Sequence, residues 1–250
     1  MDAMLLVTVG LLAGIWNAIA GGATLFSFPA LMALGLSPMV ANATNFVALF
    51  PANLAALPAY GPELRAVGRA LLPILGTSCL GAAAGSALLL ISDPALFRVL
   101  IPFLLLLATL LFAFGDRLRA GLIALAGEAR GAHIAFAALF LTSIYGGYFG
   151  AGLGIILLGI AQILGYEDFH TANAIKNLTA TGFVLVSIAV FGLGGLIAWP
   201  EALTMMAGST MGGYLGGRIA KRVNQRLLRS AVIAFGLILT AVYILDVFGR

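Results

Sequence analysis

The chain has 250 residues, of which 62% are hydrophobic and only 9% are charged, and its formal net charge is +4. Soluble domains carry about a quarter charged residues, so this composition excludes a protein with an ordinary water-facing surface. A helix needs ~20 apolar residues to cross ~30 Å of hydrocarbon. Several apolar runs reach that length, and the mean hydropathy is +1.12. We therefore predict an all-α polytopic membrane protein.

Hydropathy divides the chain into eight apolar units. In chain order they cover 4–34, 38–59, 66–91, 95–114, 132–165, 170–197, 200–217 and 227–247. The first and fifth units are longer than one crossing requires, and both contain glycines near the middle. Gly21 and Gly22 interrupt the first unit, and Gly152 and Gly154 lie within the fifth. We expect each of these two units to form a helical hairpin with a glycine-rich break.

The chain also repeats itself at an offset of about 131 residues, which is a signature of transporters built from two related halves. The segment 41–45 resembles the segment 172–176. We predict two homologous four-unit repeats, 1–114 and 132–250, each beginning with a glycine-broken hairpin. A polar cytoplasmic linker at 115–131 is expected to join them.

Two pairs of glycines also correspond between the halves. Gly81 and Gly85 match Gly213 and Gly217 in the alignment of the repeats. Small residues four positions apart allow two membrane helices to approach closely. We interpret both pairs as packing residues rather than as part of a site.

The basic residues favour repeats that are inverted rather than parallel. If all eight units cross, six basic residues of the loops fall on each side, contrary to the positive-inside rule. If the two long units enter and return on one side, only Arg98 and Arg250 lie apart from the other ten. We expect this topology, with the linker in the cytoplasm and both termini outside. Full crossing stays open, because half-helices of ~13–16 residues reach ~20–24 Å.

Polar side chains within apolar units mark candidate sites, because they are costly in lipid. Asn42 and Asn45 share one face of the second unit, and Asn173, Lys176 and Asn177 share a face of the sixth. Folding the halves together would bring both stripes toward one axis, with a solute site at mid-membrane. The amides could instead bond only to neighbouring helices. Lys176 could instead extend to the membrane surface.

An inward-facing lysine beside amide donors would form a receptor for a small anion. The two breaks add to this interpretation, because half-helix N-termini expose free N–H groups and the positive end of the helix dipole. The candidate substrate-binding residues are Gly21, Gly22, Asn42, Asn45, Gly152, Gly154, Asn173, Lys176 and Asn177. The expected partners are a small anionic solute and the lipid bilayer, with no nucleic acid.

Signatures of enzymes are missing from the apolar units. There is no phosphate-binding loop with lysine, no metal-ligand cluster and no arrangement of a serine or metal hydrolase. We therefore expect neither an enzyme nor a cofactor or metal. The acidic residues lie at predicted helix ends, so coupling to protons or sodium stays open. An anion channel also stays open, because it could use the same hairpins and polar faces.

Three motifs follow one another along the chain, two in the first half and one in the second. They are the glycine-rich break of the first unit, the turn at 35–38 leading into 41–45, and the glycine-rich run at 146–154. Together they resemble the sulfite exporter TauE/SafE family over nearly the whole chain. The resemblance implies a multi-pass transporter of the bacterial inner membrane that moves sulfite or organosulfonates such as sulfoacetate. The residues alone indicate an anion and leave small carboxylates as alternative substrates.

Overall fold

The computed structural model describes residues 3–20, 22–54, 57–219 and 225–249, and every regular element within these ranges is helical. The α-helices are α1 (Ala3–Ala20), α2 (Thr24–Ala33), α3 (Pro38–Leu54), α4 (Gly61–Val67), α5 (Leu71–Ile91), α6 (Pro94–Tyr148), α7 (Gly154–Ile163), α8 (Phe169–Leu193), α9 (Trp199–Ile219) and α10 (Gln225–Phe248). Two short 3-10 helices, η1 (Leu57–Tyr60) and η2 (Gly68–Ala70), flank α4.

Four helical stretches are long and apolar enough to cross a membrane. They are Gly61–Ile91, Pro94–Gly121, Phe169–Leu193 and Ser230–Phe248. Three further apolar helices, Ala3–Asn17, Thr24–Ala33 and Gly154–Ile163, are shorter than a full crossing requires. The prediction of an all-α polytopic membrane protein is confirmed.

The first and fifth apolar units each contain two helices separated by a break. Gly22 separates α1 from α2 and has a φ of +73°. The break between α6 and α7 contains Gly150 and Gly152, with φ values of +79° and +80°. Glycine adopts positive φ without the steric cost that a Cβ would bring, so these residues end regular helix where the sequence predicted an interruption. Gly21 lies outside the described residues.

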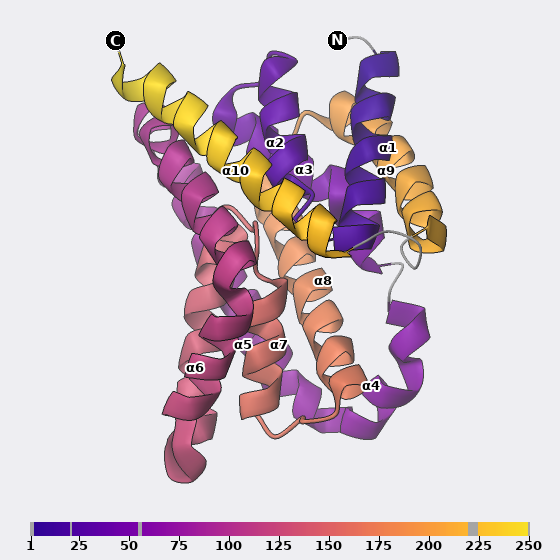
Figure 1. Ribbon diagram of the computed structural model, residues 1–250, viewed down its shortest axis with the longest axis vertical. Helices are drawn as coiled ribbons and strands as arrows, with labels where there is room; N and C mark the ends of the chain where they lie inside the picture. Colours follow the sequence, from indigo (N-terminus) through magenta and orange to yellow (C-terminus); the bar gives the residue numbers. More distant parts are fainter. Residues whose placement is uncertain (1–2, 21, 55–56, 220–224, 250) are drawn as a thin grey trace.

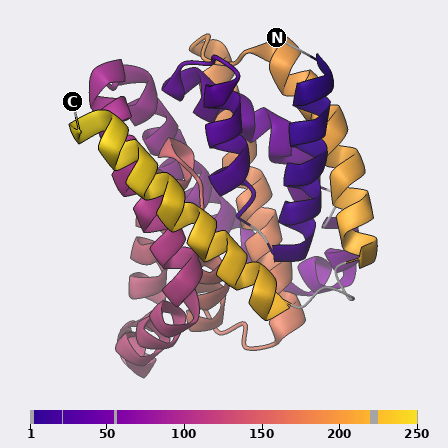
Figure 2. The ribbon, with the colours of Figure 1, turned by 45° about the horizontal axis from the view of Figure 1, so that its top comes forward.

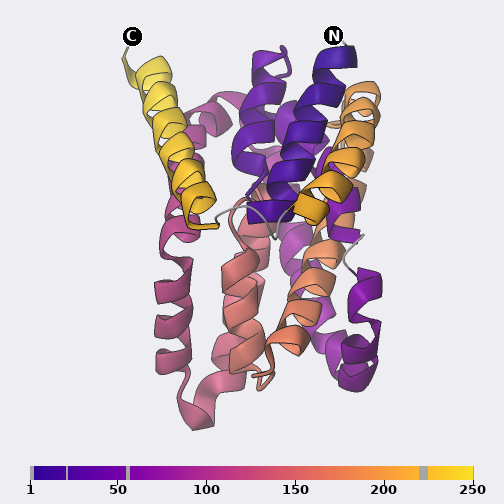
Figure 3. The same cartoon turned by 45° about the vertical axis from the view of Figure 1, so that its right-hand side comes forward.

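The helices beside the two breaks enter from opposite ends of the molecule (Figure 3). α1 runs inward from the N-terminal end and α2 returns to that end, whereas α7 runs from the interior to the opposite end. Both chain termini lie at the end where α2 meets α3, and the turn between α7 and α8 lies at the other end (Figure 1). Both breaks therefore lie within the molecule.

Helix α6 turns back on itself although its 55 residues are helical throughout. The rings of Phe97 and Tyr148, near its two ends, have centroids 5.7 Å apart. A straight helix would separate these residues by ~77 Å. The turn lies at the lower end of the molecule in Figure 3. It falls in the range 115–131 that was expected to be a linker, which the structure shows as helical.

Two closely packed helix pairs join distant parts of the sequence (Figure 2). α1 packs along α9, and α5 packs along α6. Backbones approach closely at glycines, because a Cβ on Gly14 of α1 would collide with the carbonyl of Ser209, and one on Gly212 of α9 would collide with the carbonyl of Leu11. Gly85 of α5 lies in the same way against Ile144 of α6. Such contacts provide the van der Waals packing that holds helices together in lipid.

The structure confirms one predicted glycine pair and corrects the other. Gly81 and Gly85 both pack against α6. Gly213 has open space where its Cβ would be, whereas a Cβ on Gly208 or Gly212 would collide with the backbone of α1. Spacing along the sequence cannot show which face of α9 meets α1, and that face decides which glycines are needed. The surroundings of Gly217 lie outside the described part of the chain.

Two acidic residues at helix starts serve as caps. Asp93 accepts the N–H groups of Ala95 and Leu96 at 2.7 and 3.1 Å, at the start of α6. Asp168 accepts the N–H and the hydroxyl of Thr171, both at 2.8 Å, at the start of α8. The hydrogen bond from the backbone N–H of Thr171 is the main cause that lowers the pKa of Asp168. Both carboxylates thus satisfy helix N-termini at the ends of membrane spans.

We predict that Gly212→Ala lowers the free energy of unfolding by about 1–3 kcal/mol, because its methyl group would push the backbones of α1 and α9 apart. The matched control is Gly213→Ala on the same helix, where the methyl group enters open space. Thermal melting of both variants in detergent, followed by tryptophan fluorescence, measures the difference. Equal melting temperatures for the two variants would show that this close contact is not needed.

Candidate functional site

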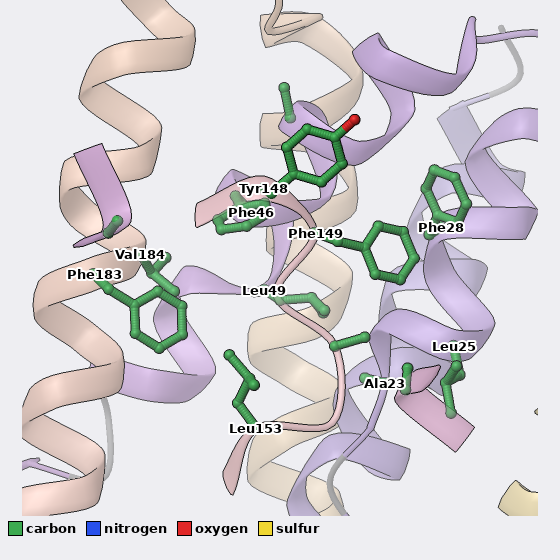
Figure 4. Packing of buried hydrophobic residues seen from close by; sticks show 14 of the residues in the cluster. Ala23, Leu25, Phe28, Phe46, Leu49, Tyr148, Phe149, Leu153, Phe183 and Val184 are labelled. Atoms are coloured by element: carbon green, nitrogen blue, oxygen red, sulfur yellow. The ribbon is translucent and has the colours of Figure 1, made fainter. Parts of the chain in front are cut away.

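Large buried side chains from several helices surround the break between α6 and α7 (Figure 4). Phe149 packs edge-on against Phe28 of α2, with ring centroids 5.3 Å apart. Gly150 lies against the ring of Phe46 of α3, and Gly146 lies near Phe183 of α8. Helices from both halves of the chain therefore meet at this one break.

Asn42 of α3 caps the broken end of α6. Its Nδ2 donates to the carbonyl of Tyr148 at 2.9 Å, while the hydroxyl of Ser86 on α5 donates to the carbonyl of Gly147 at 3.2 Å. The last carbonyls of a helix have no partner within that helix, and lipid cannot supply one. Asn42 is fully buried, and its Oδ1 has no partner among the described residues. The amide thus holds the break and leaves one acceptor unused inside the protein.

The next polar residues of α3 bind two other elements. Asn45 accepts a hydrogen bond at 2.6 Å from the hydroxyl of Ser27, which lies on α2. Thr44 accepts the backbone N–H of Ala198 at 3.1 Å, just before α9. One short stretch of α3 therefore connects the first hairpin, the second break and the start of α9.

The polar stripe of α8 faces the protein interior. Lys176 lies two turns before the buried Phe183, and helical periodicity places both on one face. Leu185, which is 55% exposed, lies on the opposite face. Lys176 is half-buried, as are Asn173 and Asn177 beside it. No described carboxylate forms an ion pair with Lys176. Its position therefore argues against a side chain that extends through the lipid-facing surface.

The two predicted stripes do not meet in one cluster. Phe46, one residue after Asn45, contacts Phe191 of α8 with ring centroids 5.4 Å apart. Phe191 is fifteen residues from Lys176, which corresponds to ~22 Å along the helix. The Asn42 and Asn45 side chains therefore lie toward one end of the contact between α3 and α8, and Lys176 lies toward the other.

The glycines of the candidate site have different surroundings. A Cβ on Gly22 would touch the ring of Phe112 at 3.6 Å, and one on Gly152 would press on the carbonyl of Ala108 at 2.8 Å. Both breaks therefore approach the part of α6 that precedes its turn, which contains Ala108 and Phe112. Gly154 is exposed, with open space at its Cβ position, and it is the first residue of α7. The free N–H groups of the first turn of α7 thus begin beside open space.

Several buried hydroxyls near the breaks were missed in the sequence. Ser27 and Ser86 bind neighbouring elements, as shown above, and Ser187 of α8 is fully buried with no partner for its hydroxyl in the described structure. Serine and threonine in membrane helices commonly bond to their own helix, as Thr109 does to the carbonyl of Leu105. A hydroxyl in an apolar run is therefore a weak signal. For Ser187, its position eleven residues after Lys176, three turns along the same face of α8, would have strengthened that signal.

Comparison with known proteins shows what this fold and site belong to. The family model described as sulfite exporter TauE/SafE matches residues 6–244. A probable membrane transporter protein of Haemophilus influenzae is 34% identical, with 97% of this chain and 94% of that protein aligned. The probable membrane transporter protein YfcA of Escherichia coli K12 is 26% identical, with 97% and 89% aligned. No solved structure matches significantly. The chain belongs to the sulfite exporter TauE/SafE family and is a multi-pass membrane transporter rather than an enzyme.

Proposed function

We propose that the protein is a secondary transporter that moves small anions across the bacterial inner membrane by alternating access. Sulfite and organosulfonates such as sulfoacetate are the proposed substrates, in line with the name of the family. The main support for an anionic substrate is Lys176, which lies on the interior face of α8 and forms no ion pair with a described carboxylate. A charge within the membrane is costly unless it is neutralised, and a bound anion would neutralise it.

The proposed architecture is two inverted repeats, 1–114 and 132–250. α2 and α7 end alike, since the N–H of Leu36 bonds to the carbonyl of Leu31 and the N–H of Tyr166 bonds to that of Ala161. The pairing of helices also corresponds, because α5 packs through Gly85 on the part of α6 that leads into the second break, and α9 packs through Gly212 on α1, which leads into the first. These matching contacts, with α2 and α7 leaving toward opposite ends, support an inverted relation.

The half-helices α2 and α7 are the proposed gates. Gln162, near the end of α7, accepts a hydrogen bond at 2.7 Å from Nε of Arg119 on α6. Met32, at the equivalent place near the end of α2, accepts one at 3.6 Å from the hydroxyl of Tyr243 on α10. Each half-helix is thus fastened near its outer end to a long helix. Release of one contact at a time would open one side of the protein while the other stays closed.

The separation of the polar stripes suggests that the solute is bound at two positions in turn. One position would be the Lys176 stripe of α8, and the other would be the region of Asn42 and Asn45 on α3. Asn42 uses one of the two N–H donors of its Nδ2 on the carbonyl of Tyr148, and Asn45 uses only its Oδ1, as acceptor for Ser27. The donors left for an anion at that position are therefore the second N–H of Asn42 and the two of Asn45. We expect the stronger anion binding at Lys176, where the charge is.

The substrate class and the carrier mechanism are tested by counterflow in proteoliposomes. Vesicles loaded with unlabelled sulfite or sulfoacetate are expected to accumulate labelled substrate above equilibrium, with uptake that saturates. Vesicles loaded with a small carboxylate provide the comparison. Uptake that neither overshoots nor saturates would indicate an anion channel, and overshoot only with the carboxylate would replace the sulfur-containing substrate.

We predict that Lys176→Gln raises the half-saturation concentration for the anion by roughly tenfold or more, because a hydrogen bond to a charged group contributes about 1.5–3 kcal/mol. Lys176→Arg keeps the charge and is expected to retain most of the affinity. Arg98→Gln serves as a control for the loss of one positive charge, because Arg98 forms an exposed ion pair with Asp246 at 2.8 Å. The role of Lys176 is refuted if Lys176→Gln, purified as folded protein, keeps the wild-type affinity.

The inverted topology predicts that the turns after α2 and α7 face opposite sides of the membrane. Single cysteines are placed at Ser37 and at Glu167 in a Cys79→Ala background, because Cys79 is the chain's one cysteine. An impermeant maleimide added to intact cells is expected to label Ser37→Cys, whereas Glu167→Cys reacts only after the cells are opened. Labelling of both positions from outside would support the alternative topology, in which all eight units cross.

A further inference from the structure

Two backbone carbonyls at the broken end of α6 lack partners in the described structure. Phe149 and Gly150 both donate their N–H groups to the carbonyl of Tyr145, at 2.9 and 3.1 Å. No described group donates to the carbonyl of Gly146 or to that of Phe149. Gly146 is buried, and Phe149 is 0% exposed. Both acceptors therefore lie inside the protein, where neither lipid nor bulk water supplies a partner.

Oδ1 of Asn42 is a third buried acceptor at the same place. Nδ2 of Asn42 donates to the carbonyl of Tyr148 at 2.9 Å, so this amide group lies directly against the last helical residue of α6. Oδ1 belongs to the same amide group, and it is buried without a hydrogen bond to any described residue. Buried polar atoms normally have partners, because an unpaired one has lost its hydration without compensation.

The three acceptors lie on the side of α6 that faces α3. At ~100° per residue around a helix, Phe149 lies between Tyr148 and Gly146. α3 contacts both of these neighbours. One contact is the hydrogen bond from Asn42 to the carbonyl of Tyr148. The other is at Gly150, where a Cβ would lie 2.9 Å both from the carbonyl of Gly146 and from an aromatic ring of α3. The acceptors are therefore placed to share one ligand.

The chemistry of these acceptors selects the kind of ligand. They are amide and carbonyl oxygens, which do not titrate near neutral pH, so they cannot take up a proton. They include no carboxylate, whereas calcium sites in proteins use carboxylates. One water molecule donates two hydrogen bonds and would leave one of the three acceptors unpaired. A cation of single charge fits best, and the negative end of the α6 dipole adds to its attraction.

We propose that the broken end of α6 binds a sodium ion through Oδ1 of Asn42 and the carbonyls of Gly146 and Phe149. Carbonyls at the C-terminal ends of broken helices coordinate sodium in transporters of several folds. Three protein oxygens suit a small ion, whereas potassium filters use rings of carbonyls. The site lies between the two halves of the chain, because α3 belongs to the first and the end of α6 to the second.

The sodium ion would couple its own gradient to the anion, a role that rests on the proposed function. α7 begins at Gly154, five residues after Phe149, and the free N–H groups of its first turn attract anions. The break thus presents acceptors from α6 and donors from α7. A cation and an anion bound there together would each lower the cost of the other inside the membrane. Both would therefore cross in the same direction.

Binding of radioactive sodium to the purified full-length protein in choline chloride tests the site without any transported anion. The wild-type protein is expected to bind Na⁺ saturably, and K⁺ at the same concentration is expected to displace little of it. Absence of saturable binding would mean that water molecules satisfy the three acceptors, and it would overturn the proposal. Equal displacement by K⁺ would overturn the assignment to sodium.

Asn42→Leu removes Oδ1 at nearly constant volume and is expected to weaken Na⁺ binding roughly tenfold or more, as for the loss of a contact with a charge. Thr44→Val is the matched control. Thr44 is also a buried polar residue of α3, but its hydroxyl bonds to Ala198, away from the break. Equal Na⁺ affinities of the two folded variants would remove Asn42 from the site.

Asn42→Asp gives a second test if Asn42→Leu does not fold. The aspartate keeps an oxygen at this place and adds a charge that titrates. Because burial raises the pKa of a carboxyl group, Na⁺ binding by this variant is expected to be several-fold tighter at about pH 8 than at about pH 5. The same affinity at both pH values would contradict the proposed coordination.

Uptake of sulfoacetate by proteoliposomes separates sodium coupling from the proposed function. An inward Na⁺ gradient is expected to speed uptake several-fold over choline, and sulfoacetate is expected to stimulate the entry of radioactive sodium. Saturable uptake of the anion at equal rates in Na⁺ and in choline would overturn the coupling and leave the proposed transporter in place. Saturable Na⁺ binding without uptake of any tested anion would support the ion site and overturn the proposed substrates.

Discussion

The structure depends on satisfying backbone hydrogen-bonding groups where helices break inside a membrane. Water would bond to such groups in a soluble protein, but lipid cannot. At the end of α6 the carbonyl of Tyr148 is bonded by Asn42 from α3, and the carbonyl of Gly147 is bonded by Ser86 from α5. The break is therefore stable only when these helices are in place, so the local conformation of α6 is fixed by tertiary contacts.

Close packing follows from the same requirement. Ser86 reaches the end of α6 because Gly85 lets the backbones of α5 and α6 approach, and Gly147 lies against the carbonyl of Ala82 in return. The glycines thus bring short polar side chains within reach of carbonyls on a neighbouring helix, besides increasing van der Waals contact. This explains why glycine is abundant, with 32 residues, in a chain whose helices are otherwise rich in large apolar residues.

The site separates structural and recognition roles that look alike in the sequence. Asn42 and Asn45 are buried and bonded to neighbouring elements, as membrane amides often are. Lys176, half-buried on the interior face of α8, has no described carboxylate beside it. The proposed recognition of an anion therefore rests on α8, while α3 holds the hairpins.

The sequence by itself determined that the chain is an α-helical membrane transporter of its family, and where its helices break. Composition and apolar length are enough to predict the membrane helices, and the paired glycines are enough to predict their breaks, because lipid allows few ways of satisfying a backbone. The family came from the resemblance of the glycine-rich motifs. Only the tertiary structure decided that α1 leaves no room for a Cβ at Gly208 and Gly212 but leaves it at Gly213, and that the stripes on α3 and α8 lie far apart. Spacing within one helix shows which residues share a face. It does not show which helix packs on that face, or how far along that neighbour each residue lies. Those are set by packing between segments more than a hundred residues apart in the chain.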